Sequence, residues 1–246
     1  MAEAKKVALI TGANRGIGFE TAKQLGEQGV TVVLGSRKLG DAEGAAEKLK
    51  TQGIDAYGIQ LDVTKAADRA AAYKFLEGKF GKLDILINNA GIASGHGFGT
   101  NSTTKTTDEE LKSVYETNFF SVVALTQELL PLIEKSSAGR IVNLSSILGS
   151  LGLHADPKSP IYDLKMFSYN SSKAALNAFT IHLAHELKGT PIKVNSVHPG
   201  WVKTEMGTDA APMEIPEGAK TSVAAALLGP DGPSGHFIHL GQELPW

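Results

Sequence analysis

The chain contains no cysteine among its 246 residues, which excludes disulfide frameworks, thiolate nucleophiles and zinc–sulfur sites. Its formal net charge is only −2, so it lacks the field that would attract nucleic acid or an anionic membrane. No apolar run approaches the roughly 18 residues of a membrane span, and glycines follow the first few apolar residues, unlike in a signal peptide. We therefore expect a cytoplasmic protein with no nucleic-acid or membrane partner.

Metal-ligand patterns are also missing. None of the seven histidines forms an HExxH motif. His182 and His185, three positions apart, are expected on a helix surface, and His96, in a glycine-rich segment, is expected to face solvent. The sequence therefore predicts no metal site.

What the chain does contain is an alternation of short apolar, β-branched runs with stretches of helical periodicity. The runs expected to be strands are 5–11, 30–35, 54–61, 83–89, 139–145, 192–197 and 235–240, and the expected helices are 16–28, 40–52, 64–79, 107–135, 170–188 and 217–228. A strand followed each time by a crossover predicts an α/β fold, a parallel sheet with helices on both faces. No composition shift divides the chain, so 1–246 is expected to be a single domain.

A glycine-rich turn, TGANRGIG, closes the first expected strand and opens the first helix. Gly12 suits a tight turn, Gly16 allows close approach to a phosphate, and Gly18 allows the helix to pack near the sheet. The helix N-terminus then faces a pyrophosphate. A plain strand-to-helix turn is the alternative, but this context favours dinucleotide binding.

The residues after the second strand indicate which dinucleotide is preferred. Enzymes that use NAD normally carry a carboxylate there for the ribose 2′-hydroxyl, whereas this chain has Ser36, Arg37 and Lys38. Arg15, inside the glycine turn, adds another cation. Guanidinium groups bind a 2′-phosphate well, which favours NADP(H). The alternative is that these are ordinary solvated cations.

The stretch YNSSK places Tyr169 and Lys173 four residues apart on one helix face. A phenol has an ordinary pKa near 10, and a neighbouring cation, together with that of an oxidised nicotinamide, is expected to lower it. The alternative is an ordinary surface pair. Tyr162 fits the pattern less well, because its lysine is three residues away and Pro160 precedes it.

Together with NNAG (88–91), the serines after the fifth strand and PGWVKT (199–204), these motifs resemble the short-chain dehydrogenase/reductase family over nearly the whole chain. The resemblance implies a doubly wound, Rossmann-type sheet of about seven strands. It also implies a catalytic set in which Tyr169 gives a proton, Ser146 polarises the carbonyl, Lys173 tunes the phenol, and Asn118 holds a water linking Lys173 to solvent.

The same resemblance implies where the cofactor binds. Asp62, in LDVT, would meet the adenine, although an N-cap is a competing role for Asp62 and Thr64. The backbone of Val202 and the hydroxyl of Thr204 would hold the nicotinamide carboxamide. The full expected cofactor set is Gly12, Asn14, Arg15, Gly16, Ile17, Gly18, Ser36, Arg37, Asp62, Val63, Asn89, Ala90, Gly91, Tyr169, Lys173, Pro199, Gly200, Val202 and Thr204.

The chain departs from ordinary members of the family between Ser146 and Tyr169, where the spacing is longer. Carbonyl reductases and related plant ketone reductases carry an insert there, here about 147–168. Because such an insert can cover the helix used for tetramer assembly, we expect a monomer or dimer, with a tetramer still open.

The insert, the connection 92–107 and the segment 205–218 are expected to wall a substrate pocket. Their apolar residues, each equally able to be core, are Leu151, Leu153, Met166, Trp201 and Met206. An apolar wall predicts NADPH-dependent reduction of a hydrophobic ketone or aldehyde. The alternatives are reduction of 3-oxoacyl thioesters, alcohol oxidation, or NADPH sensing without chemistry.

Overall fold

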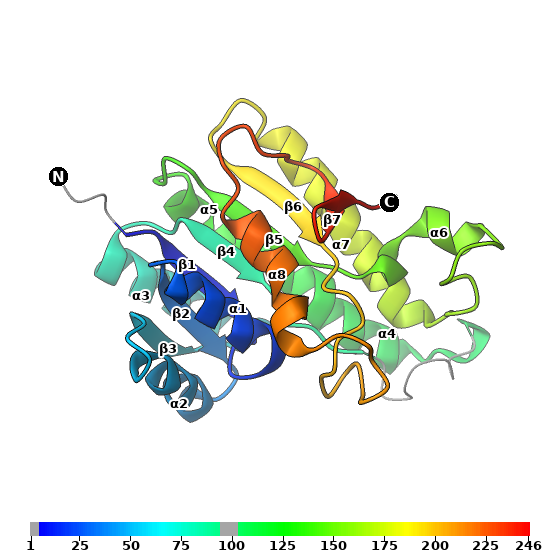
Figure 1. Cartoon of the computed structure of the whole chain (residues 1–246), viewed down its shortest axis with the longest axis horizontal. Helices are drawn as coiled ribbons and strands as arrows, with labels where there is room; N and C mark the ends of the chain where they lie inside the picture. Colours follow the sequence, from blue (N-terminus) through cyan, green and yellow to red (C-terminus); the bar gives the residue numbers. More distant parts are fainter. Residues whose placement is uncertain (1–4, 94–102) are drawn as a thin grey trace.

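A computed structural model describes residues 5–93 and 103–246 and has the α/β architecture that the sequence predicts. Eight strands form one sheet in the order β3-β2-β1-β4-β5-β6-β7-β8, flanked by helices on both faces (Figure 1). All neighbouring pairs are parallel except β7 and β8. The strands are β1 (Val7–Thr11), β2 (Thr31–Ser36), β3 (Ala56–Gln60), β4 (Ile85–Asn88), β5 (Arg140–Leu144), β6 (Lys193–Val197), β7 (Phe237–His239) and β8 (Gln242–Glu243).

The seven predicted strands are confirmed, and β8 is an eighth that the sequence did not indicate. It is two residues long and exposed, so it has no apolar run from which it could be predicted. The C-terminal residues after it return to the insert. Trp246 stacks on Phe237 with ring centroids 5.6 Å apart, and its carbonyl accepts hydrogen bonds from Ser150 Oγ and Gly152 N.

The core consists of two layers, one on each face of the sheet. Successive strand residues enter opposite layers, as Leu9 and Ile10 do, because side chains alternate along a strand. One layer packs against α1 (Gly16–Glu27), α2 (Leu39–Lys50) and α8 (Ile215–Ala226), and the other against α3 (Ala66–Phe80), α5 (Ser121–Ile133) and α7 (Phe167–Glu186). Burial on both faces explains why the central strands are continuously apolar.

The predicted helix 107–135 is not one continuous helix. It consists of α4 (Asp108–Tyr115), a five-residue π-helical turn (Glu116–Phe120) and α5. Thr107 caps α4 by accepting from the Glu110 N–H, which confirms the predicted start. A π-turn widens the helix locally and often marks a functional position. Asn118 lies inside it.

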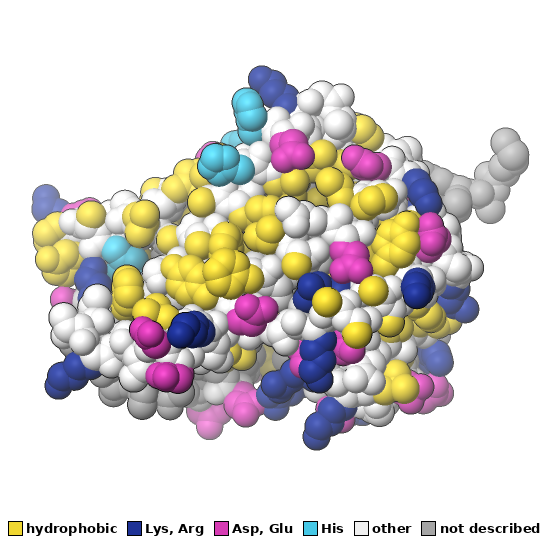
Figure 2. Space-filling model, turned by 180° about the vertical axis from the view of Figure 1, so that it is seen from behind, with side chains coloured by type: hydrophobic (Ala, Val, Ile, Leu, Met, Phe, Trp, Pro, Cys, Tyr) yellow, Lys and Arg dark blue, Asp and Glu magenta, His cyan; other side chains and the backbone are white. Residues whose placement is uncertain are grey.

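The predicted insert contains a short 3-10 turn (Ile147–Gly149) and the helix α6 (Leu151–Ala155). It packs on the start of α7, where Asn170 Nδ2 donates to the Leu164 carbonyl and lies 3.1 Å from His154 Nε2. Farther along α7, Ile181 is 41% exposed. Hydrophobic side chains gather on this side of the molecule, seen from behind in Figure 2. The expected monomer or dimer stays a prediction.

Most of the predicted connection 92–107, including His96, lies outside the described residues; within them it ends in a 3-10 turn (Thr103–Lys105). In the described parts of the chain, no helix combines the length and apolar character needed to cross a membrane. Across residues 5–93 and 103–246, no three histidine, aspartate or glutamate side chains gather in a way that could hold a metal ion.

Candidate active site

Tyr169 and Lys173 lie on the buried face of α7, just beyond the end of β5. The helix begins at Phe167, three residues before the predicted start, so Tyr169 belongs to its first turn. Only 8% of Tyr169 and 4% of Lys173 are exposed. Lys173 Nζ lies 5.6 Å from the centre of the phenol ring and donates a 2.7 Å hydrogen bond to the Leu144 carbonyl. The pair is therefore not an exposed surface pair.

Ser146 follows β5 and faces the same phenol. Its hydroxyl hydrogen-bonds to Tyr169 and accepts from the Leu148 N–H at 3.2 Å, which caps the 3-10 turn. Ser145, the other serine of the pair, is buried, and its hydroxyl has no protein hydrogen-bond partner. Of the two serines, the structure brings Ser146 to Tyr169.

Asn118 is fully buried and ties the π-turn to the segment after β4. Its Oδ1 accepts from the Ile92 N–H at 2.8 Å, and its Nδ2 donates to the Ile92 carbonyl at 2.9 Å and to Ser172 Oγ at 3.1 Å. Both side-chain N–H groups are therefore used within the protein. The expected water link to Lys173 stays a prediction.

Gly91 lies where these groups meet. A Cβ built on it would lie 3.3 Å from Asn118 Oδ1 and 3.6 Å from Lys173 Nζ. The four predicted catalytic residues thus come together from the π-turn, the end of β5 and the start of α7.

Burial dominates the titration of the tyrosine and lysine. It raises the pKa of Tyr169 to about 12, against a smaller lowering by the Ser146 hydrogen bond. It lowers the pKa of Lys173 to about 8. In the protein chain by itself, burial outweighs the lowering by the Ser146 hydrogen bond, so the phenol pKa lies above its ordinary value rather than below it. The expected lowering also depended on the cation of an oxidised nicotinamide, which does not contribute to the pKa values of the protein alone. The expectation for the cofactor-bound protein stays a prediction.

The glycine turn has the predicted geometry. Gly12 and Gly16 have φ of +62° and +57°, a left-handed conformation that favours glycine. A Cβ on Gly18 would lie 2.5 Å from Asn89 Nδ2, which explains why α1 needs a glycine at this close contact. Asn89 in turn donates to the carbonyls of Thr11 and Gly12, at 2.7 and 3.1 Å, and so joins the turn to the end of β4.

The end of β2 presents Ser36, which is buried, followed by Arg37 and Lys38, which are exposed. Asp62 Oδ1 accepts from the N–H and hydroxyl of Thr64, at 3.2 and 2.8 Å. Burial acts to raise the pKa of Asp62, but these bonds and the cations Lys65 and Arg37 lower it overall. The N-cap alternative is wrong, because α3 begins after Lys65 without a side-chain cap.

Val63 is buried in the core, so its side chain has a packing role. The segment after β6 lies beside the glycine turn: a Cβ on Gly16 would lie 3.8 Å from the Thr204 methyl group. Gly200 has φ of +92°, and Thr204 Oγ1 accepts from the Gly207 N–H at 3.0 Å. The remaining predicted residues Asn14, Ala90, Gly91 and Pro199 lie in these same turns after β1, β4 and β6, and Ile17 lies in the first turn of α1.

One contact was not predicted from the sequence. Arg15 Nη1 forms an ion pair with Glu205 Oε2 at 2.5 Å, which joins the glycine turn to the segment after β6. The partners are 190 positions apart (205 − 15), and no local pattern links them.

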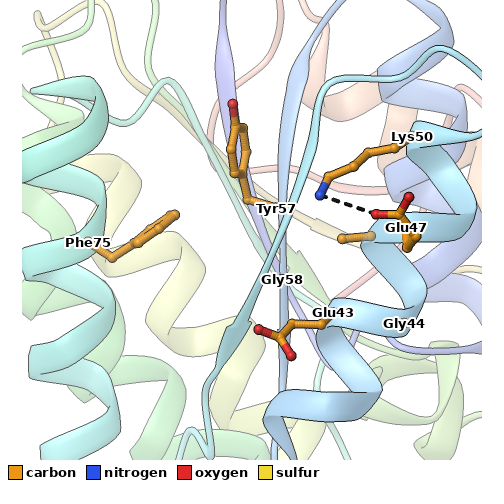
Figure 3. A pocket seen from close by; sticks show the side chains of 8 residues that line it. Glu43, Gly44, Glu47, Lys50, Tyr57, Gly58 and Phe75 are labelled. Atoms are coloured by element: carbon orange, nitrogen blue, oxygen red, sulfur yellow. Dashed lines mark hydrogen bonds and ion pairs between the residues drawn. The ribbon is translucent and has the colours of Figure 1, made fainter.

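Only some of the apolar residues expected to wall the substrate pocket are buried. Met166 is buried with Leu148, Ile161 and Tyr169, and Leu153 packs against this cluster. Leu151, Trp201 and Met206 are exposed, at 67%, 48% and 37%. A separate hollow of about 500 Å³ lies at the outer edge of the sheet, between α2, β3 and α3 (Figure 3). Its lining contains none of the predicted site residues.

Comparison with known proteins decides the family. Residues 6–215 match the model of the short chain dehydrogenase family. The chain belongs to this family of oxidoreductases. Among relatives, it is 33% identical to (−)-isopiperitenone reductase of Mentha piperita, over 99% of both chains. It is 35% identical to a 3-oxoacyl acyl-carrier-protein reductase of Staphylococcus aureus, over 92% of this chain and 86% of the relative.

Among solved structures, the chain is similar to an NADPH-bound carbonyl reductase from chicken fatty liver, with a TM-score of 0.84 and 28% identity over 99% of this chain and 100% of that one. Short-chain dehydrogenases use nicotinamide dinucleotides, and the residues present fit such a group. The left-handed glycines bring N–H groups of the turn and of α1 to the sheet edge, and nothing lies closer than 3.8 Å to a Cβ on Gly16.

Proposed function

We propose that this protein reduces a ketone or aldehyde carbonyl to an alcohol with NADPH, on a mainly hydrophobic substrate. The observation that carries the proposal is the buried Tyr169, hydrogen-bonded to Ser146 and placed beside the Lys173 ammonium. A surface tyrosine–lysine pair would need neither the burial nor the serine. The similarity to a solved carbonyl reductase supports the same reaction class.

A bound reduced nicotinamide would supply the hydride that reaches the carbonyl carbon. Ser146 donates a hydrogen bond to the carbonyl oxygen and so polarises it. Tyr169, with a pKa of about 12, is protonated at neutral pH and gives its proton to that oxygen as negative charge develops there. An alkoxide is the stronger base, so this transfer is favourable.

Lys173 stabilises the phenolate that remains after this transfer. With a pKa of about 8, it is mainly protonated at pH 7, so its positive charge faces the phenolate at short range. In a buried site this attraction is stronger than in water. The same lysine can then return a proton to the tyrosine and regain one from solvent through the predicted water at Asn118.

We assign the cofactor to the turns after β1, β2, β4 and β6. The glycine turn and the start of α1 hold the pyrophosphate. Arg37, which is exposed at the end of β2, binds the 2′-phosphate, and Arg15 assists. Thr204 and the backbone of Val202 hold the nicotinamide end. The cytoplasmic location and the single-domain organisation remain predictions.

The substitution Tyr169→Phe tests the proposed chemistry. It removes the proton donor while keeping the ring, so turnover should fall by about 10²- to 10⁴-fold while NADPH still binds. The matched control is Tyr73→Phe on α3, whose hydroxyl bonds Glu77 and which should keep wild-type turnover. Turnover is followed through loss of reduced nicotinamide absorbance with a panel of aryl ketones. Full activity in Tyr169→Phe would refute the assignment.

A second candidate is reduction of 3-oxoacyl thioesters, favoured by the 35% identity to the bacterial 3-oxoacyl reductase. Adding acyl thioesters and secondary alcohols to the substrate panel separates this reaction, alcohol oxidation and ketone reduction. NADPH binding with no turnover on any substrate would instead support a sensing role.

A further inference from the structure

The ion pair between Arg15 and Glu205 spans the predicted cofactor site. Arg15 precedes α1 in the glycine turn, and Glu205 directly follows Thr204. Their side chains are 68% and 73% exposed, so solvent reaches the pair. The carboxylate is thus placed on the arginine proposed to assist 2′-phosphate binding.

Among residues 5–93 and 103–246, Arg15 is the one cation that forms an ion pair with Glu205. Lys203, two residues earlier, forms its own ion pair with Glu214. Arg37 acts on Asp62, whose pKa it helps to lower. Glu205 therefore pairs with a cation on which the proposed NADPH binding depends.

Exposed ion pairs contribute little to stability, typically about 0–1 kcal/mol. A phosphate carrying about −1.5 to −2 charge is a stronger partner for a guanidinium than one carboxylate. The pair can therefore open when a phosphate arrives, but the carboxylate then remains close to a second anion. A cofactor with a 2′-hydroxyl lacks this phosphate, and the pyrophosphate that remains is common to both cofactors.

We propose that Glu205 is a specificity-determining residue that weakens binding of the 2′-phosphorylated cofactor by competing for Arg15. This inference rests on the proposed NADPH-dependent function. Glu205 thereby narrows the preference for NADPH over NADH, without contact with the reacting atoms.

The test is the substitution Glu205→Gln, which keeps the side-chain shape and removes its charge. Dissociation constants for NADPH and NADH are measured by titration calorimetry at 0.05 and 0.5 M salt. We expect NADPH to bind about two- to fivefold more tightly at low salt, with NADH unchanged. The gain should shrink at high salt, because exposed charges are screened.

Two further variants sharpen the result. In an Arg15→Met background, Glu205→Gln should no longer improve NADPH binding, since nothing is left to compete for. Glu27→Gln, at the far end of α1 and roughly 16 Å along the helix from Gly16, removes an equal charge from a Lys23 pair and should leave both constants unchanged. Circular dichroism and thermal melts check that each variant is folded.

Unchanged or weaker NADPH binding in Glu205→Gln would overturn the inference while leaving the proposed function intact. An equal gain for NADH, or an undiminished gain in the Arg15→Met background, would also overturn it. If the wild-type protein binds neither cofactor, the proposed function fails and the inference fails with it. Tight NADPH binding without carbonyl reduction would refute only the reaction.

Discussion

The burial of Lys173 predicts a specific dependence of stability on pH. Its pKa is about 8 in the folded protein against an ordinary value of 10.5, because burial disfavours the ammonium. The unfolded chain therefore binds more protons between these values, and the free energy of unfolding rises as the pH rises through this window. At about 1.4 kcal/mol per pH unit, the full effect is about 3 kcal/mol.

Between pH 7.5 and 10, about 2 kcal/mol of this effect should appear. Tyr169 acts in the opposite direction, but only above its ordinary pKa of 10, since burial raises its folded pKa to about 12. The perturbation is Lys173→Met, which removes the titrating group at similar volume. It also removes the bond to the Leu144 carbonyl, a loss that is the same at both pH values.

The assay is urea unfolding followed by circular dichroism, on wild type and Lys173→Met, at both pH values. The gain in unfolding free energy from pH 7.5 to 10 should be about 2 kcal/mol larger for wild type than for the variant. The difference between the two gains cancels the titrating groups that do not interact with Lys173. Equal gains would show that Lys173 keeps its ordinary pKa, and would refute the argument from burial.

Three other outcomes are expected. Arg37→Ala should raise the Michaelis constant for NADPH about tenfold, from the loss of a charge-assisted contact, and leave that for NADH nearly unchanged; equal effects would refute the 2′-phosphate assignment. Arg140→Lys should lower the unfolding free energy by about 2–4 kcal/mol in urea titrations, because this buried guanidinium donates five bonds to backbone carbonyls and one ammonium cannot replace them. Gly18→Ala should lower the free energy of unfolding by about 1–3 kcal/mol, because its Cβ would lie 2.5 Å from Asn89 Nδ2. Gly44→Ala, which has open space around it on α2, should raise the free energy of unfolding by up to about 1 kcal/mol. Equal shifts of the two variants in thermal melts would contradict the packing argument.

Periodicity and turn chemistry predicted most of the fold. Apolar runs located seven strands, since a strand buried on both faces must be apolar throughout. They failed for the two exposed residues of β8 and for the π-turn at Asn118, which has the same apolar spacing as a continuous helix. The insert was located from the Ser146–Tyr169 spacing, but its helix α6 and its contact with Trp246 were not.

The candidate site divides in the same way. The four-residue spacing on a helix nominated Tyr169 and Lys173, and the family resemblance nominated Ser146 and Asn118. Ion pairing and protonation were not predictable, because they depend on neighbours distant in sequence and on depth below the surface.

Local pattern, by itself, determined the α/β class, the glycine turn and the helix spacing of Tyr169 and Lys173, since these depend on backbone sterics and side-chain period. Only the tertiary structure decided that Lys173 and Tyr169 are buried enough to shift their pKa values in opposite directions, and that Arg15 pairs with Glu205. Solvation and Coulomb energies depend on distances through space, and folding sets those distances.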